Sequence, residues 1–366
     1  SDGDRARLER AAGAARTAFD EHAAWLRGTL ADGTDEWALG RERYDALIGL
    51  RAFDGLDADA ILDIGWRQLA EHEAARAAAA REIDPTADER AVLERVKSDH
   101  PDTFEAALDA YRDAMLRARA HLVERGIVSV PDDDRISVVP TPEYVRNVIP
   151  FAAYFEPPKF DPAPGGIYVV TPSVDGDPRA MLEHSYSSIS NTSIHEAYPG
   201  HHLQLTVAGR HPSLTRLLAD APEFVEGWGM YSEQLMREHG FDDGPAFRLN
   251  MHTDAIWRAC RIVLDVRMHR GELSIEEAIR FLAERTGFLE PNARAEVRRY
   301  TYTPTYQLSY LLGKVLLLAL RADEGRRLGS AFDLRRFHDT LLANGSLPIS
   351  FHRRLLAEAS GAARPA

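Results

Sequence analysis

The strongest constraint on the fold is a helical spacing of apolar residues that runs through most of the chain. Apolar residues recur three or four positions apart between residues 3 and 31 and in the stretch HPDTFEAALDAYRDAMLRARAHLVERG. The pattern returns from about residue 178 to the end, for example in SIEEAIRFLAERTG and FDLRRFHDTLLANG. Glycines that suit helix ends stand at Gly126, Gly287 and Gly345. The sequence therefore predicts a mainly α, multi-helix fold.

Residues 136–172 depart from this pattern. ISVVPTPEYV and GGIYVVTP are short β-branched and aromatic runs bounded by Pro and Gly, which favour a few short strands. Between them, EPPKFDPAPGG is a Pro-rich stretch that we expect to be an ordered surface connection. Every cluster of chemical interest lies after Ile136. We therefore expect an N-terminal helical subdomain over 1–130 and a catalytic metal-binding domain over 131–366, joined as one continuous globular unit.

Composition limits the partners. The net charge of −13 over 366 residues argues against nucleic acid or an anionic membrane bound through a broad basic face. The single cysteine, Cys260, excludes an intrachain disulfide and a thiolate-rich zinc site. No stretch approaches the roughly 20 apolar residues of a membrane span. The N-terminus lacks the apolar core of a signal peptide, so we expect a cytoplasmic location; because Ser1 is not Met, a removed leader stays open.

The stretch NTSIHEAYPGHHLQL looks like a zinc-protease helix that has been interrupted. In the H-E-x-x-H motif the second histidine ligand stands four residues after the first, but Pro199 occupies that position here. In a regular helix His201 would be rotated by about 240° from His195. A break at Pro199 and Gly200 would return His201 to the place of the second ligand. His202 is the competing candidate, on the face of His195 but roughly 10 Å along the helix.

A second cluster, EFVEGWGMYSEQL, follows and is predicted to be a helix that opens near Pro222. Glu226 stands 25 residues after His201, a spacing typical of the third ligand in gluzincin-type peptidases. The alternative is that the glutamates of this helix are ordinary surface charges. Gly227 and Gly229 argue against that alternative, because each glycine in a helix costs about 1 kcal/mol unless close packing or a ligand needs the space.

These two segments together resemble the bacterial family known as domain of unknown function 885, which carries H-E-x-Y-P-G-H-H-x-Q and E-G-W-A-x-Y-x-E segments. IWRACRIVLDVRMH and YQLSYLLGKVLLLALR agree with two further blocks of the family. The resemblance covers roughly residues 140–356, whereas the first 130 residues match only in being helical. Gly229 stands where Ala is common, and Val266-Arg267 replaces a usual Thr-Gly, which bears on substrate choice.

The resemblance implies a gluzincin-like zinc metallopeptidase fold and activity, related to the carboxypeptidase Taq and thimet oligopeptidase groups. It implies one Zn²⁺ per chain, with His195, His201 and Glu226 as ligands and Glu196 as general base. The implied reaction is hydrolysis of a peptide or peptide-like amide bond by metal-activated water, with a carboxypeptidase-like mode favoured.

Two further groups of residues are candidates for the chemistry. Tyr306 and Tyr310, four apart on a helix that can begin after Pro304, are candidate donors to the oxyanion; the alternative is that both belong to the core. The other candidates lie at steps of three or four in IWRACRIVLDVRMH, which also places Asp265 on the same helix face. Arg258 and Arg261 are expected to bind a substrate carboxylate, and His269, with Asp265, to support the catalytic centre by orienting ligands. The alternative is a solvated or salt-bridged face.

Two rival functions stay open at this stage. A pathway enzyme could use the same metal centre on a small-molecule amide or another C–N bond. A catalytically dead metallopeptidase fold could serve as a binding module, although the retention of both His195 and Glu196 argues against it. The sequence does not decide substrate identity, exo- or endo-cleavage, the native metal or the oligomeric state.

Overall fold

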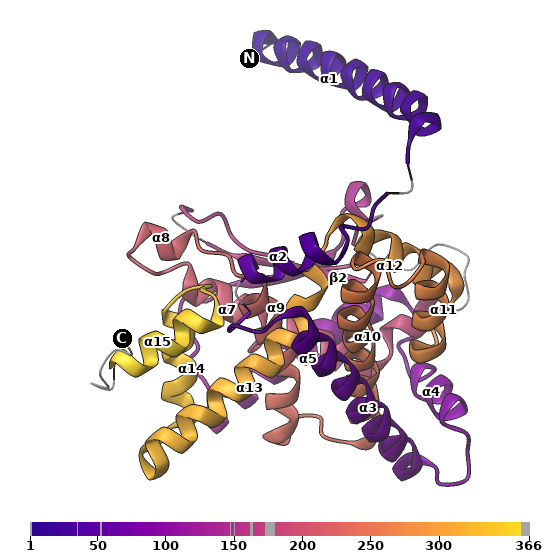
Figure 1. Ribbon diagram of the computed structural model, residues 1–366. Helices are drawn as coiled ribbons and strands as arrows, with labels where there is room; N and C mark the ends of the chain where they lie inside the picture. Colours follow the sequence, from indigo (N-terminus) through magenta and orange to yellow (C-terminus); the bar gives the residue numbers. More distant parts are fainter. Residues whose placement is uncertain are drawn as a thin grey trace.

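The computed structural model describes residues 2–34, 36–51, 53–146, 148–149, 151–161, 164–172 and 180–359. Within these ranges the chain is mainly helical with three short strands, which confirms the predicted fold class (Figure 1). The helices are α1 (Asp2–Thr29), α2 (Arg41–Arg51), α3 (Ala58–Ile83), α4 (Glu89–Lys97), α5 (Phe104–Arg125), α6 (Tyr186–Glu196), α7 (His201–Ala208), α8 (Leu214–Leu217), α9 (Pro222–Glu238), α10 (Pro245–His269), α11 (Ile275–Thr286), α12 (Glu290–Tyr302), α13 (Ser309–Leu328), α14 (Leu334–Ala343) and α15 (Ile349–Ala359).

Helix ends follow the capping residues of the sequence. Gly126 and Gly287 end α5 and α11 in the left-handed conformation, at φ 62° and 75°, where a glycine has no Cβ to clash. Ser274 and Glu277 form a complete capping box at the start of α11. These local signals account for the accuracy of the helix predictions.

The three strands form one small sheet in the order β1-β3-β2. The strands β1 (Ile136–Pro140), β2 (Ala152–Phe155) and β3 (Gly166–Val170) lie in the region where strands were predicted. β3 pairs parallel with β1 and antiparallel with β2. The sheet packs against α5 through β1 and against α6 through β2, so it lies directly beside one of the helices that carries the candidate ligands.

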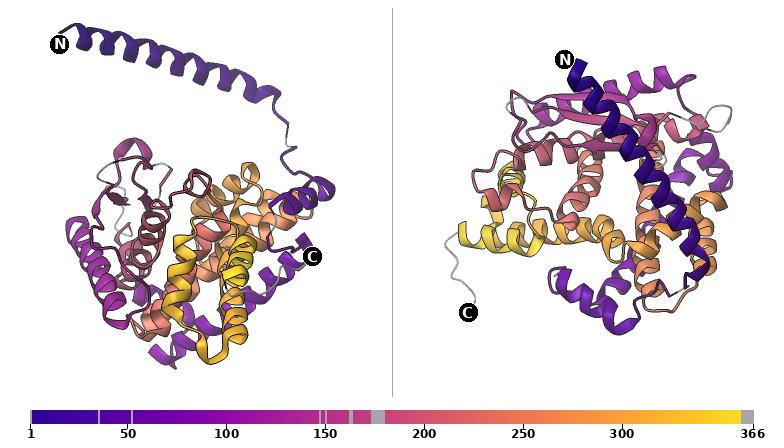
Figure 2. Two further views of the ribbon diagram at one scale, coloured as in Figure 1. Left: turned by 90° about the vertical axis from the view of Figure 1, so that its left-hand side faces the viewer. Right: turned by 90° about the horizontal axis from the view of Figure 1, so that it is seen from above.

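Helix α1 stands away from the rest of the molecule in Figure 1 and in the left-hand view of Figure 2. None of its residues is buried, and Phe19 and Trp25 are exposed. The main hydrophobic core contains residues from both sides of position 130, from Tyr44 to Leu356, and a smaller cluster is formed by Ala79, Ala80, Val92 and Leu249. The boundary predicted near residue 130 stays a prediction. None of the helices in the described part of the chain is both long and apolar enough to cross a membrane.

Two helix pairs build the centre of the body: α10 packs along α3, and α9 packs along α13. The second pair crosses at two glycines. A Cβ placed on Gly227 would lie 2.5 Å from the carbonyl carbon of Gly313, closer than any real side chain can approach. Gly227 therefore lets α9 lie directly on α13, and α9 in turn contacts α6 and α7.

Candidate metal centre

The interrupted motif folds as two helices separated by four residues. Helix α6 ends at Glu196 and α7 begins at His201, which confirms the break predicted at Pro199 and Gly200. The Gly200 N–H donates to the carbonyl oxygen of Ile194 over 3.0 Å. A Cβ on Gly200 would overlap the carbonyl oxygen of His195, so only glycine fits where the chain doubles back on α6.

The break is tied to the helix that carries the third candidate ligand. Trp228 of α9 is buried, and its indole N–H donates to the carbonyl oxygen of Pro199 over 2.7 Å. This bond fixes the start of α7 relative to α9. Trp228 of the EGWGMY segment therefore links the two sequence motifs through this hydrogen bond.

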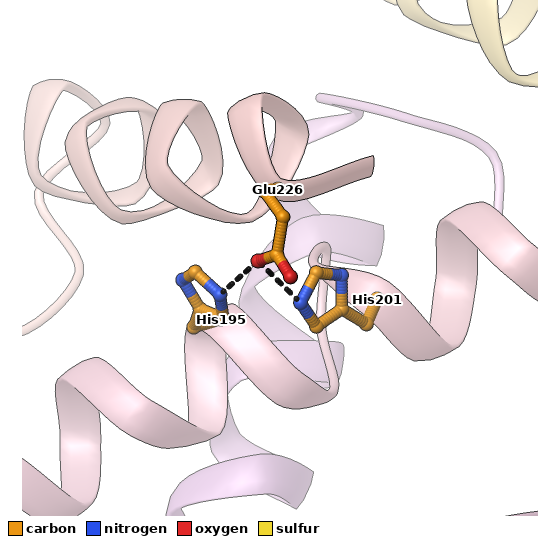
Figure 3. Close-up of side chains that lie close together, drawn as sticks. All are labelled: His195, His201 and Glu226. Atoms are coloured by element: carbon orange, nitrogen blue, oxygen red, sulfur yellow. Dashed lines mark ion pairs between the residues drawn. The ribbon is translucent and has the colours of Figure 1, made fainter. Parts of the chain in front are cut away.

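His195, His201 and Glu226 converge from α6, α7 and α9 (Figure 3). The Nε2 atoms of His195 and His201 lie 3.6 and 3.5 Å from Glu226 Oε2. One potential ligand atom from each residue lies within 4.8 Å of the others. Two imidazole nitrogens and one carboxylate oxygen are the donor set of many catalytic zinc sites, which keep a fourth position for water. The residues fit a zinc ion; that they bind one stays a prediction.

His202, the competing candidate, points elsewhere. Its Nε2 lies 2.6 Å from Asp134 Oδ1, and its Nδ1 lies 3.0 Å from the hydroxyl of Tyr154. Both ring nitrogens are thus engaged with the segment before β1 and with β2. The geometry places His201, and not His202, in the cluster.

A buried carboxylate that was not predicted to be functional orients His195, the first candidate ligand. His195 Nδ1 lies 2.7 Å from Glu233 Oε1, which leaves Nε2 to face Glu226. The Asn191 side-chain amide donates to the other oxygen of Glu233 over 3.0 Å. The sequence signal for this role was the seven-residue step from Glu226 to Glu233, which puts both on one face of α9.

The charges of the cluster favour a cation between them. Burial by itself lowers the pKa of His195, but hydrogen bonds with Glu226 and Glu233 outweigh it and raise the pKa to about 10. Burial by itself raises the pKa of Glu226, but hydrogen bonds from His195 and His201 hold that pKa well below its usual range. A raised pKa favours the imidazolium form of His195 between Glu226 and Glu233 in the metal-free protein, and a divalent cation bound at Nε2 would take the place of its proton.

Gly229 makes room for the ring of His195. A Cβ on Gly229 would lie 2.7 Å from Cε1 of the His195 ring, so the ring packs directly on the backbone of α9. The two glycines of this helix therefore serve different contacts, Gly227 with α13 and Gly229 with the ligand. Both contacts confirm the expectation that these glycines allow close approach.

The residue proposed as general base follows the first ligand directly. Glu196 is partly exposed at the end of α6 and makes no hydrogen bond or ion pair with any residue that the structure describes. Its carboxylate still raises the pKa of the buried Tyr111 and Tyr168 through space, after the larger effect of their burial. Glu196 thus stands beside the cluster with its carboxylate uncommitted.

The two predicted tyrosines differ in their distance from the cluster. Tyr306, in the 3₁₀ turn Tyr306–Leu308, donates from its hydroxyl to Glu226 Oε1 over 3.1 Å. The Tyr310 ring packs edge-on against Tyr306, with centroids 6.0 Å apart. Burial, followed by the nearby charge of Glu226, raises the pKa of Tyr306 and raises that of Tyr310 to about 12. Both are therefore neutral phenols at physiological pH.

The predicted arginines have internal partners. The buried guanidinium of Arg261 donates to Glu296 over 3.0 Å and lies over the rings of Trp257 and Tyr310. Arg258 also lies over Trp257, and its charged partner is Asp254 at 3.5 Å. No described contact brings either arginine to the ligands. Arg261 in particular is already paired, with Nη2 donating to Glu296 and Nε to the hydroxyl of Tyr300, so we do not retain it as a carboxylate receptor.

His269 lies in the core at the end of α10, away from the cluster in all its contacts. Its Nε2 lies 3.0 Å from the carbonyl oxygen of Tyr300, and its ring stacks against Tyr44 and meets Trp37 edge-on. Asp265, four residues earlier, contacts Tyr44 as well. Neither residue orients a ligand by direct contact, so the expected support of the ligands by His269 and Asp265 has no basis in their positions.

Comparison with known proteins identifies relatives of unknown function. The model of a family described as "Bacterial protein of unknown function (DUF885)" matches residues 1–356, so the match extends through the first 130 residues, where the motifs alone gave no specific resemblance. No curated protein matches the chain. One similar solved structure is described as "the putative lipoprotein from Colwellia psychrerythraea", with 25% identity over 91% of this chain and a TM-score of 0.81.

A second solved structure, "a putative lipoprotein of unknown function from Shewanella oneidensis", has 23% identity over 93% of this chain and a TM-score of 0.80. This likeness shows a shared fold. The chain spans 58% and 65% of the length of these two proteins.

Proposed function

The chain belongs to the DUF885 family of bacterial proteins of unknown function, and from this premise we propose that it is a zinc-dependent hydrolase of peptide or peptide-like amide bonds. One observation carries the proposal: His195, His201 and Glu226 bring their ligand atoms within 4.8 Å of one another from three helices. Glu196, next to His195, has a carboxylate that bonds to none of the described residues and can act as a general base. A purely structural zinc site does not need such a group. We also propose that the helical body is a gluzincin-like metallopeptidase fold.

The metal, when bound, would polarise the scissile carbonyl and make water a stronger acid. His195, His201 and Glu226 would hold it, with Glu233 fixing the ring of His195 so that Nε2 faces the metal. Glu196 accepts the proton of the attacking water and passes it to the leaving amine. A general base must be free to contact water, and the Glu196 carboxylate bonds to none of the residues that the structure describes.

Tyr306 is the proposed donor to the oxyanion. Its neutral hydroxyl already reaches the cluster, at 3.1 Å from Glu226, and can turn to the oxygen on which negative charge develops. Tyr310 packs behind it and limits the positions of its ring. Tyr310 is therefore assigned to support Tyr306, and contact with the substrate is assigned to Tyr306.

Metal content is the first test. Protein purified without added metal is analysed by plasma mass spectrometry, alongside Glu196→Gln, Glu226→Gln and Glu238→Gln. Glu238 lies on the same helix as Glu226 but pairs with Arg321, so it serves as the matched control. We expect about one zinc per chain in the wild type, in E196Q and in E238Q, and strongly reduced zinc in E226Q. No retained zinc in the wild type after zinc loading would overturn the proposal.

Turnover is the second test. A panel of peptides with free or amidated C-termini is compared with small acylated amines, using zinc-loaded wild type and E196Q. Hydrolysis by the wild type that is lost in E196Q supports the proposed mechanism, and a requirement for the free C-terminus assigns carboxypeptidase action. Preference for acylated amines supports the pathway-enzyme alternative. Bound zinc without turnover of any amide supports the binding-module alternative.

The location of the protein also stays a proposal. The sequence predicts a cytoplasmic protein, whereas the two similar solved structures are each described as a "putative lipoprotein". Fractionation of the native organism into soluble and membrane-bound protein distinguishes the two locations.

A further inference from the structure

Thr305 has a backbone conformation that its side chain disfavours. Its φ is 69°, in the left-handed region. Among the described residues, the other non-glycine residues with positive φ are Asp54 and Asp242, whose type tolerates this region. A β-branched residue there is an outlier, and such outliers persist only when the surroundings enforce them.

A buried carboxylate holds this conformation in place. Asp265 of α10 is fully buried, and its Oδ2 accepts the backbone N–H of Thr305 over 2.8 Å. The same oxygen accepts the hydroxyl of Tyr44 over 2.7 Å. Tyr44 is also fully buried, so Asp265 and the tyrosine that binds it are both held by the core. Thr305 itself is buried and cannot move into solvent.

The enforced turn aims the next residue at the metal centre. Tyr306 follows Thr305 directly, and its hydroxyl reaches Glu226 Oε1. The turn closes locally through the N–H of Tyr306, which donates to the carbonyl oxygen of Thr303, and the N–H of Leu308, which donates to that of Thr305. Because the direction of Tyr306 depends on the dihedral angles of Thr305, a relaxed Thr305 would point the phenol away from Glu226.

We propose that Asp265 is a positioning residue that acts on the metal centre through the Thr305 amide and Tyr306. This inference rests on the proposed function, because it gives Tyr306 a part in the reaction. It replaces the sequence-based expectation that Asp265 orients a ligand directly. An ordinary core carboxylate would stabilise the fold without any specific effect on Tyr306.

The test distinguishes the effect of losing the hydrogen-bond acceptor of Asp265 from the effect of changing the volume of its side chain. Asp265→Leu removes the acceptor and keeps a similar size, whereas Asp265→Asn keeps a neutral oxygen acceptor. Asp339→Leu is the matched control, because Asp339 accepts the backbone N–H of Ser129 over 2.7 Å in the same manner at a different place. Hydrogen exchange of the peptide 303–308 is measured by mass spectrometry in metal-free protein, and zinc content and kcat are measured separately.

We expect D265L to exchange faster over 303–308 than the wild type and D339L, with unchanged zinc content. Its kcat should fall by about 10²-fold, in the range for a lost oxyanion donor, with little change in KM. The fall in kcat should be smaller in D265N than in D265L. The additional change Thr305→Gly favours the left-handed conformation without help from Asp265, so D265L/T305G should recover at least tenfold in kcat.

Two outcomes overturn the inference: unchanged exchange over 303–308 in D265L, or no recovery in D265L/T305G despite intact zinc. If D265L does not fold, Asp265→Ala with and without Thr305→Gly repeats the test with a smaller side chain. The exchange measurement needs no substrate, so it judges the control of the turn even if the wild type hydrolyses no amide. Absence of hydrolysis in the wild type would count against the proposed function and against the catalytic part of this inference, while altered exchange would still establish the contact that sets the turn.

Discussion

At the scale of single residues, the candidate metal centre depends on how each candidate ligand is held. His195 has one nitrogen for Glu226 and the other for Glu233, so its ring cannot flip without losing a charged partner. His201 lacks such a partner: its Nδ1 is buried with no hydrogen bond among the described residues. The two histidines are therefore not equivalent, because Glu233 orients the ring of His195 alone.

Replacing Glu233 with Gln should weaken metal binding without removing it. The amide keeps an acceptor for His195 Nδ1 but loses the charge that makes the imidazole a better ligand. We expect the zinc dissociation constant to rise by about 10–100-fold, measured by competition with a chromophoric chelator. Glu238→Gln on the same helix serves as the control. An affinity within threefold of the wild type would show that Glu233 does not support the ligand.

The sequence predicted the members of this cluster but not its supports. The break at Pro199 and Gly200 could be read from the residue types, because proline and glycine have known backbone limits. The choice between His201 and His202 could not, because it depends on Asp134 lying next to His202, a contact across 68 residues of chain. Spacing within one segment contains no information about such a partner.

At the scale of helices, the geometry of the candidate metal centre depends on the position of α9. That helix carries Glu226 and Glu233, anchors the break through Trp228, and is set against α13 at Gly227. At Gly227 the backbones of α9 and α13 lie in direct contact. No side chain there could move to accommodate a larger residue.

Substituting Gly227 with Ala should therefore destabilise the protein. The new Cβ would lie 2.5 Å from Gly313, and overpacking of this kind costs about 1–3 kcal/mol, which exceeds the gain of up to about 1 kcal/mol in helix propensity. Gly325→Ala on α13 is the control, since a Cβ there meets nothing within 4 Å and should stabilise slightly. Urea unfolding of both variants provides the comparison. Equal stability of the two would contradict the crossing as described.

Local sequence signals predicted the helices and strands better than their assembly. Glycine caps and apolar spacing marked the ends of α5 and α11, and the short strands lie within the predicted region. The polar face of α10 was predicted to face the centre, whereas Arg261 pairs with Glu296 of α12. A polar stripe looks the same whether it lines a site or a buried ion pair, so periodicity could not separate the two.

At the scale of the whole molecule, the three candidate ligands come from three helices and meet only in the folded chain. Zinc should therefore bind the native state alone and stabilise it by about 2.7 kcal/mol at a free concentration of 100 times the dissociation constant. We expect the melting temperature to rise with zinc and to fall back with EDTA in the wild type and in E196Q. E226Q should show no such rise. Equal shifts in E226Q would indicate zinc bound elsewhere.

The core also contains a carboxylate whose ionisation opposes folding. Burial raises the pKa of Asp265 from 3.8 to about 7, despite hydrogen bonds from Tyr44 and the Thr305 N–H that lower it. The native state thus binds a proton more tightly than the unfolded chain does. The stability contributed by this group is complete below about pH 3.8 and is lost as the pH rises through the folded-state pKa of about 7.

Asp265→Asn removes this titration while keeping an acceptor for Thr305. The free energy of unfolding of D265N, relative to the wild type, should therefore increase between pH 4.5 and 7 and level off above that, with a slope of at most about 1.4 kcal/mol per pH unit. Both proteins are unfolded with urea in EDTA, so that proton release by the metal ligands does not enter. Parallel pH profiles for the two proteins would mean that Asp265 ionises as easily in the native core as in the unfolded chain. The predicted rise in the stability of D265N relative to the wild type would instead show that the carboxylate holding the Thr305 turn is kept at a cost in stability, as expected of a group retained for the position of Tyr306.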